Sequence, residues 1–244
     1  MKRLSVILLS LALCFFSANA QKMYALLTGV SNYGDEQVNL HNTTKDVKEL
    51  RKVLERQSNV NVTVVTSKYA NYANIKQKLK AITQLAKSDD TVLFFFSGHG
   101  ATGGFATSDE VLFQYQELVN VLKSTRARNV VVLIDACLSG SAKSISKDNF
   151  GLGNQYPKIT FLTACNDDEN SAENNWVGNG LFAQALLKGL RGIADENGDK
   201  QVTLIELFKY AYKDVTARTK NYDSCQHPQL IGPKSMYNLV LTRW

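Results

Sequence analysis

A histidine and a cysteine stand at matching places in two apolar segments of this 244-residue sequence. His99 follows the run "TVLFFFS" between Gly98 and Gly100, and Cys137 follows the run "NVVVLIDA". A cysteine thiol becomes a nucleophile when an imidazole accepts its proton and solvent reaches it. Taken singly, a structural histidine and a small buried cysteine are the more ordinary interpretation. Their matching positions, with glycines that let a substrate backbone approach, favour a nucleophile and its base.

The surrounding sequence predicts a layered α/β domain. Five runs rich in β-branched and aromatic residues predict buried strands at 24–30, 62–66, 91–96, 129–136 and 159–164. Apolar residues at helical spacing lie between the strands, at 47, 50 and 54 and at 75, 79 and 82. Strands that are apolar on both faces and alternate with amphipathic helices are typical of a parallel sheet covered on both sides, a three-layer arrangement.

The second half of the chain completes this prediction. Further helical patterns lie near 180–190 and 203–218, and "MYNLVLT" (236–242) is predicted to be a sixth strand at the sheet edge. In an open parallel sheet, ligands bind beyond the carboxyl ends of the strands. His99 and Cys137 both stand there, so the predicted fold would bring them together.

The first 20 residues have the three parts of a secretory signal. Lys2 and Arg3 precede an apolar run over 4–16, and Ala18-Asn19-Ala20 forms a small-residue cleavage site. An uncleaved anchor is the alternative, but this run is shorter than the roughly 20 residues that a transmembrane helix needs. We therefore expect residues 21–244 to form one exported domain, periplasmic or extracellular, with no membrane attachment after cleavage.

Charge and cysteine content narrow the function classes. The formal charge of +6 includes Lys2 and Arg3, so the mature chain carries +4, and its basic residues are scattered along helical faces. This pattern favours a solvated surface over a nucleic-acid site. The three remaining cysteines are an odd number, which disfavours a disulfide framework. We expect Cys165 to be a core residue, and Cys225, with His227 and His41, to be structural or exposed.

Three motifs in order resemble the caspase and metacaspase superfamily of cysteine peptidases. "FFFSGHG" resembles the histidine motif, "DACLSG" the cysteine motif DSCHSG, and "TACNDDENSAENNWVGNGLFAQALLKGL" the SACxDDQxSAD segment with its following helix. The resemblance extends from "YALLTGVSNY" to the last strand. It implies the caspase fold, with five parallel strands and an antiparallel edge strand. It also implies peptide-bond hydrolysis through an acyl-thioester on Cys137, with His99 as acid and base.

The resemblance also implies where substrate binds. The backbone N–H groups of Gly100 and Cys137 would form the oxyanion hole. Asp135 and Asp46 would line the S1 pocket, with Thr43 and Ser97 beside them. Two converging carboxylates favour a basic P1 side chain, Arg or Lys, and repel an acidic one. The alternatives are a carboxylate at a strand end that caps N–H groups, for Asp135, and a favourable acid in a helix's first turn, for Asp46.

Two further sites are predicted. The irregular stretch 138–158 corresponds to the junction between caspase subunits, and Lys143, Lys147 and Lys158 within it are candidates for self-cleavage. The segment "DENGDKQVTLIE" has the spacing of a calcium loop. Its candidate ligands are Asp195, Asn197, Asp199, Gln201, Thr203 and Glu206. Lys200 stands where such a loop needs glycine, and a polar turn that caps the next helix is the alternative.

These observations predict an exported cysteine endopeptidase that acts on proteins or peptides with basic P1 residues. We expect no required cofactor, with calcium as the one candidate ion, and no nucleic-acid partner. Two alternatives stay open: a non-catalytic binding protein of the same fold, and a transpeptidase that uses the same acyl-enzyme. The presence of both His99 and Cys137 argues against the first.

Overall fold

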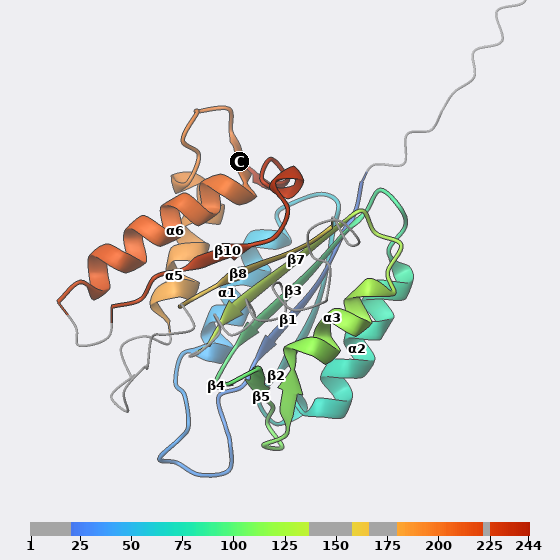
Figure 1. Cartoon of the computed structure of the whole chain (residues 1–244), viewed down its shortest axis with the longest axis vertical. Helices are drawn as coiled ribbons and strands as arrows, with labels where there is room; N and C mark the ends of the chain where they lie inside the picture. The colour runs from blue at the N-terminus through green and yellow to red at the C-terminus, as the bar shows by residue number, and fades with distance from the viewer. Residues whose placement is uncertain (1–20, 137–157, 166–179, 222–224) are drawn as a thin grey trace, which may run out of the picture.

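The computed structural model describes residues 21–136, 158–165, 180–221 and 225–244. Its centre is a six-stranded sheet in the order β10-β8-β7-β3-β1-β2 (Figure 1). The strands are β1 (Met23–Gly29), β2 (Val60–Thr66), β3 (Thr91–Ser97), β7 (Asn129–Asp135), β8 (Ile159–Thr163) and β10 (Gln229–Ile231). All neighbouring pairs are parallel except β10 with β8, which is antiparallel. The prediction of a mostly parallel α/β sheet is confirmed.

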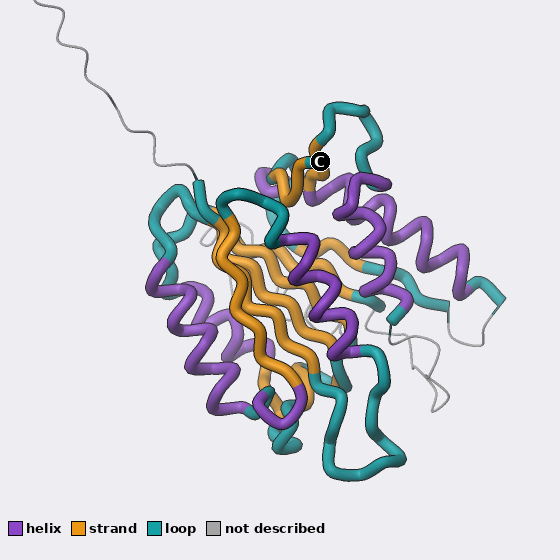
Figure 2. The backbone as a smooth tube through the Cα atoms, turned by 180° about the vertical axis from the view of Figure 1, so that it is seen from behind, coloured by secondary structure: helices purple, strands orange, loops and turns teal. Residues whose placement is uncertain are grey.

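Helices cover both faces of this sheet. They are α1 (Thr43–Leu54), α2 (Tyr72–Leu85), α3 (Tyr115–Lys123), α5 (Leu181–Lys188), a π-helical turn (Gly189–Ile193) and α6 (Leu204–Thr219). Helices α2 and α3 lie on one face, and α1, α5 and α6 on the other, as Figures 1 and 2 show from opposite sides. Short 3₁₀ turns lie at Ser67–Tyr69 and Lys234–Met236.

Alternation along the strands builds a separate core on each face. Phe94 and Phe96 of β3 belong to the cluster under α2 and α3, whereas Leu93 and Phe95 belong to the cluster under α1, α5 and α6. Successive strand side chains point to opposite faces, so a strand buried on both sides must be apolar throughout. This is why the predicted strands read as continuous apolar runs.

Two small sheets accompany the central one. Strands β4 (Gly100–Ala101), β5 (Gly104–Ala106) and β6 (Leu112–Gln114) form an antiparallel sheet directly after His99. The ring of Phe105 in β5 stacks between Phe96 and Phe113, with centroid distances of 4.0 and 5.1 Å. This stacking fixes the segment that follows β3 to the core beneath it. Strands β9 (Gln201–Thr203) and β11 (Val240–Arg243) form the other sheet.

The prediction of the sixth strand was wrong. The sixth strand of the central sheet is β10, at the edge beside β8, whereas β11, which overlaps the predicted 236–242 segment, pairs with β9. The apolar pattern of that segment arises because Met236 and Leu241 are buried in the core under α1, α5 and α6. Strand β10 is only half-buried along its length and has no apolar run to reveal it.

Across the described residues, no helix combines the length and the apolar character needed to cross a membrane.

Candidate active site

His99 lies just beyond the end of β3, at the edge of the sheet where the parallel strands finish. The Gly98 N–H donates to the Asp135 carbonyl of the neighbouring strand over 3.2 Å. A Cβ atom at position 98 would stand 2.6 Å from the Tyr33 hydroxyl oxygen and 2.7 Å from Cζ of Phe96. Only glycine fits there, so the glycine before His99 is explained by close packing.

Hydrogen bonds hold both the backbone and the ring of His99. Its backbone N–H donates to the Tyr33 hydroxyl over 2.7 Å, and its Nε2 lies 2.6 Å from the Val38 carbonyl oxygen. A carbonyl can only accept, so Nε2 carries a proton and donates it. In the neutral imidazole, Nδ1 then has the lone pair. The geometry leaves Nδ1 as the basic atom of His99.

The predicted S1 residues come from three elements that meet at this edge. Thr43 and Asp46 lie in the first turn of α1, Ser97 ends β3, and Asp135 ends β7. Ser97 and Asp135 are register partners across the β3–β7 pair. All four side chains are buried, and Asp135 and Asp46 are only 1% and 6% exposed. The structure therefore brings Thr43, Asp46, Ser97 and Asp135 to one buried region.

The pKa values of the two carboxyl groups are both raised. Burial and, to a lesser extent, the Asp46 charge raise the pKa of Asp135 to about 8, although the Ala183 N–H in the first turn of α5 opposes this by donating to Oδ2 over 3.3 Å. Burial raises the pKa of Asp46 to about 7, with the Lys45 charge acting in the opposite direction. The predicted capping role of Asp135 is thus present, because its Oδ2 accepts the Ala183 N–H.

Two buried oxygen atoms in this region have unused hydrogen-bonding capacity. Among the described residues, Asp46 Oδ2 and Thr43 Oγ1 are buried without any hydrogen-bond partner. An isolated buried carboxylate is unfavourable unless a cation or several hydrogen-bond donors accompany it. The region is therefore suited to accept a positively charged group that donates hydrogen bonds.

Several predicted site residues lie outside the described residues. These are Cys137, Lys143 and Lys147. Ala136, directly before Cys137, ends the described part of this segment, and its carbonyl accepts the thiol of buried Cys165 at 3.6 Å. Gly100 begins β4 and is half-buried. The prediction that Cys165 belongs to the core is confirmed.

Lys158, the third candidate for self-cleavage, is tied into the fold. Its Nζ donates to the Thr125 carbonyl over 2.8 Å, and its own carbonyl accepts the Val130 N–H over 2.6 Å. Burial lowers the pKa of this lysine. Cleavage after Lys158 would require both contacts to break, so this placement disfavours it as a processing site.

The predicted calcium loop forms a tight turn before α6. The Asp195 carboxylate accepts backbone N–H groups from Gly198, Asp199 and Lys200 at 2.8 to 3.2 Å. Lys200 has a φ of 64°, the left-handed conformation that glycine adopts without strain. The chain thus makes the sharp turn at this position although it has lysine there.

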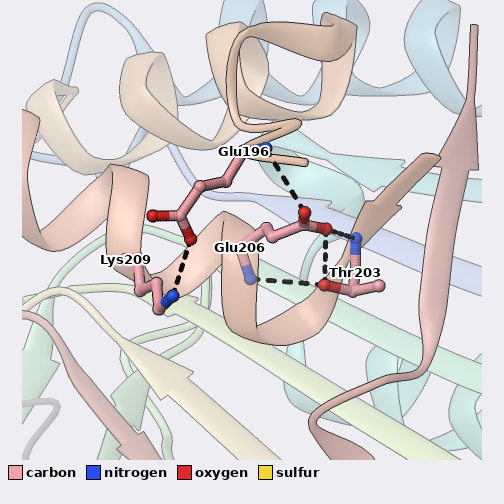
Figure 3. Close-up of polar contacts among 4 residues, drawn as sticks. All are labelled: Glu196, Thr203, Glu206 and Lys209. Carbon is pink, nitrogen blue, oxygen red and sulfur yellow. Dashed lines mark hydrogen bonds and ion pairs between the residues drawn. The ribbon is translucent and has the colours of Figure 1, made fainter. Parts of the chain in front are cut away.

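The end of this loop caps helix α6. The Glu206 carboxylate accepts the N–H groups of Glu196 and Thr203 and the Thr203 hydroxyl, and the Thr203 Oγ1 accepts the Glu206 N–H (Figure 3). Lys209 pairs with Glu196 at 2.6 Å. Such a capping box contributes about 1 kcal/mol to helix stability.

Across the described residues, no group of three or more His, Cys, Asp or Glu side chains is placed to hold a metal ion. Asn197 and Gln201 lie in the same turn, on either side of Asp199. This arrangement supports the alternative of a polar turn that caps the next helix. Calcium binding stays a prediction that titration has to test.

Sequence reasoning missed three contributors to this region. Val38 and Ala183 act through backbone groups, which no pattern of side chains reveals. Tyr33 lies in the segment "YALLTGVSNY", yet nothing in its spacing indicates that its hydroxyl reaches the backbone of His99 66 residues away. The interactions around the histidine motif depend on tertiary contacts that the sequence alone does not display.

Comparisons with known proteins define the class. A family model described as the caspase domain matches residues 22–236, most of the chain. The chain therefore belongs to the caspase-domain family of cysteine peptidases. A search of curated protein sequences gave no significant match.

Solved structures are similar in fold. The crystal structure of a protein from Geobacter sulfurreducens has a TM-score of 0.65 and 16% identity, covering 91% of this chain and 99% of that one. Caspase-1 from Spodoptera frugiperda also has a TM-score of 0.65 and 16% identity, covering 92% and 93% of the two chains. At this identity the similarity shows a shared fold, and it confirms the caspase-like architecture.

Proposed function

We propose that this protein is an exported cysteine endopeptidase that cleaves peptide bonds after arginine or lysine. The observation that carries the proposal is the buried pair Asp46 and Asp135, two carboxyl groups close enough for the charge of Asp46 to raise the pKa of Asp135. In the empty protein this pair is unfavourable, because burial and like charge both oppose ionisation. A guanidinium or ammonium group that enters the region relieves both penalties, whereas an acidic side chain adds to them.

The strand register supports His99 and Cys137 as the reacting pair. Ser97 and Asp135 are partners on adjacent strands. His99 lies two residues beyond Ser97, and Cys137 two residues beyond Asp135. Parallel neighbours leave the sheet at the same edge, so the two residues follow from adjacent points. The Val38 carbonyl fixes the proton on Nε2, which leaves Nδ1 to accept the proton of the thiol.

The reaction then proceeds in two stages. Nδ1 of His99 takes the thiol proton, the Cys137 thiolate attacks the scissile carbonyl, and the N–H groups of Gly100 and Cys137 stabilise the resulting oxyanion. His99 returns the proton to the leaving amine, and a thioester remains on Cys137. Water, deprotonated by His99, hydrolyses this thioester and releases the free thiol. The chemistry needs no cofactor.

Export follows from the predicted signal over residues 1–20 and is tested by N-terminal sequencing of secreted protein, for which we expect a start at Gln21. A start at Met1 would contradict it.

A transpeptidase would use the same thioester but release it to an amine. A peptide assay with added amine acceptors separates the two, because only the transpeptidase gives a ligated product as its main product.

The central test uses matched fluorogenic peptides with Arg, Lys, Asp or a neutral residue at P1. We expect the mature protein to hydrolyse only the basic pair and Cys137→Ala to hydrolyse none. Asp135→Asn, which keeps the shape and removes the charge, should lose most of the preference for basic over neutral P1. Unchanged selectivity in Asp135→Asn would contradict the role of the pocket. If the wild type cleaves no peptide, labelling of Cys137 by an arginyl electrophile distinguishes a latent enzyme from a binding protein.

A further inference from the structure

The loop between β1 and α1 (residues 30–42, the β1–α1 loop) contacts the histidine from two sides. Tyr33 approaches the backbone of His99, and Val38 approaches its ring. The two rings of Tyr33 and His99 lie with centroids 4.6 Å apart, tilted by 47°. One loop therefore controls both the position of the His99 backbone and the orientation of its imidazole.

His99 needs such support because of its neighbours. It is half-buried between Gly98 and Gly100, and glycine gives a backbone more freedom than any other residue. An imidazole displaced by about 1 Å can cost on the order of a hundredfold in rate. The Tyr33 hydroxyl is the acceptor that fixes the backbone N–H at this point. Burial raises the pKa of Tyr33 above its ordinary value, so the hydroxyl stays neutral.

The β1–α1 loop is itself closed by one side chain. Asn39 Oδ1 accepts the Tyr33 N–H over 2.8 Å, and the Leu40 N–H donates to the Ser31 carbonyl over 2.9 Å. Tyr33 is buried in the core, and Leu40 packs against the same cluster. Asn39 directly follows Val38, whose carbonyl accepts the hydrogen bond from the His99 Nε2–H group. A single amide thus ties the residue that holds the His99 backbone to the residue that holds its ring.

We infer that Tyr33 and Asn39 are positioning residues, which hold His99 in the orientation and tautomer needed to accept the proton of the nucleophile. The inference rests on the proposed function, because it assigns these residues to that same reaction. Neither residue touches substrate in this account. Tyr33 acts on the His99 backbone, and Asn39 acts through Tyr33 and Val38.

Four variants test the inference with the Arg peptide. Tyr33→Phe removes only the hydroxyl. Asn39→Leu removes the acceptor at nearly constant size, whereas Asn39→Asp retains an oxygen acceptor for the Tyr33 N–H. Asn32→Leu is the matched control, since Asn32 Oδ1 accepts the Gly34 N–H in the same loop over 2.8 Å and has no contact with His99 among the described interactions.

We expect Tyr33→Phe and Asn39→Leu to lower kcat about tenfold and to leave KM within about twofold of the wild-type value. This is the pattern expected when His99 is misaligned in the transition state while substrate binding is unchanged. The pH profile of kcat/KM should shift in the same two variants. Asn39→Asp should restore most of the rate, and Asn32→Leu should match the wild type. Thermal melting confirms that each variant folds. Wild-type kcat and an unchanged pH profile in both Tyr33→Phe and Asn39→Leu would overturn the inference.

A second measurement tests, without an activity assay, the bracing of His99, which is the set of contacts by which Tyr33, Asn39 and Val38 hold it. In an imidazole NMR spectrum, with His99 assigned by His99→Ala, the Nε2 proton should exchange slowly in wild type and Asn39→Asp and rapidly in Tyr33→Phe and Asn39→Leu. Equal exchange in all four proteins overturns the inference. A wild type that neither cleaves peptides nor reacts with an arginyl electrophile overturns the proposed function instead, and the NMR result still decides whether the bracing exists.

Discussion

The charge state of Asp46 and Asp135 should control the preference for a basic P1 residue as pH changes. The pKa of Asp46 is raised to about 7, mainly by burial, and that of Asp135 to about 8, by burial and by the Asp46 charge. Without a cation beside them, both groups are protonated well below neutral pH and ionised at alkaline pH. A cationic P1 side chain is attracted only by the ionised forms, so the preference should fall as pH decreases.

The magnitude follows from these two values. With apparent pKa values of about 7 and about 8 for the pair, nearly all pockets hold at least one ionised carboxylate at about pH 8. At about pH 6 roughly one pocket in ten does. A single positive charge needs at least one carboxylate, so we expect about a tenfold loss of preference between these two pH values.

The assay compares kcat/KM for peptides with arginine and citrulline at P1. Citrulline is a neutral side chain of nearly the same shape, so effects of pH on His99 or Cys137 cancel in the ratio. Asp135→Asn is the control, with a smaller ratio that changes less with pH. A wild-type ratio that stays constant within about twofold between about pH 8 and about pH 6 would refute the reasoning.

Three further predictions concern stability. The pKa of Asp135 in the folded protein is raised above its unfolded value of about 3.9, so the stability that the protonated group provides is lost as pH rises from about 4 to about 8. In differential scanning calorimetry at about pH 8, the free energy of unfolding of Asp135→Asn should be at least about 1 kcal/mol larger than that of the wild type, which corresponds to a Tm roughly 2–4 °C higher. A variant that melts at or below the wild type would contradict this. Gly98→Ala should lose about 1–3 kcal/mol in denaturant unfolding, because its Cβ meets the Tyr33 hydroxyl at 2.6 Å, and wild-type stability would mean that this contact relaxes freely. Glu206→Ala should lower Tm equally with EDTA and with calcium, since it removes the α6 capping box; a calcium-dependent gain in wild-type Tm would instead establish the predicted ion site.

The parallel strands inside the sheet were predictable because their burial is nearly complete. Strand β3 is buried at every residue, and such a strand must be apolar on both faces. Short elements with partial burial escaped prediction. Strand β10 is half-buried at all three residues, and the β4–β5–β6 sheet is held by the stacking of Phe105 on Phe96 of β3 and on Phe113 of β6. Tertiary contacts, which leave no local pattern, determine these elements.

The candidate site likewise contains residues that the sequence could predict and residues that only the structure shows. Asp46 and Asp135 could be named from the family resemblance. Only the structure shows that the Asp46 charge raises the pKa of Asp135 and that Asp46 Oδ2 has no hydrogen-bond partner among the described residues. Val38 could not be predicted, since it contributes a carbonyl that any residue could supply. Tyr33 could be suspected only once its hydroxyl was seen beside the His99 N–H.

The energetics of the Asp46–Asp135 region connect stability to the proposed reaction. When both groups are ionised, two buried carboxylates reduce the stability of the protein, and a pair of amides in their place would remove the repulsion. Such an arrangement is favourable only when a cation completes it. Under the proposed function, the P1 side chain supplies this positive charge, and binding energy is then gained next to the strand ends that lead to His99 and Cys137. The proposal therefore places selection of a basic P1 residue beside the scissile bond.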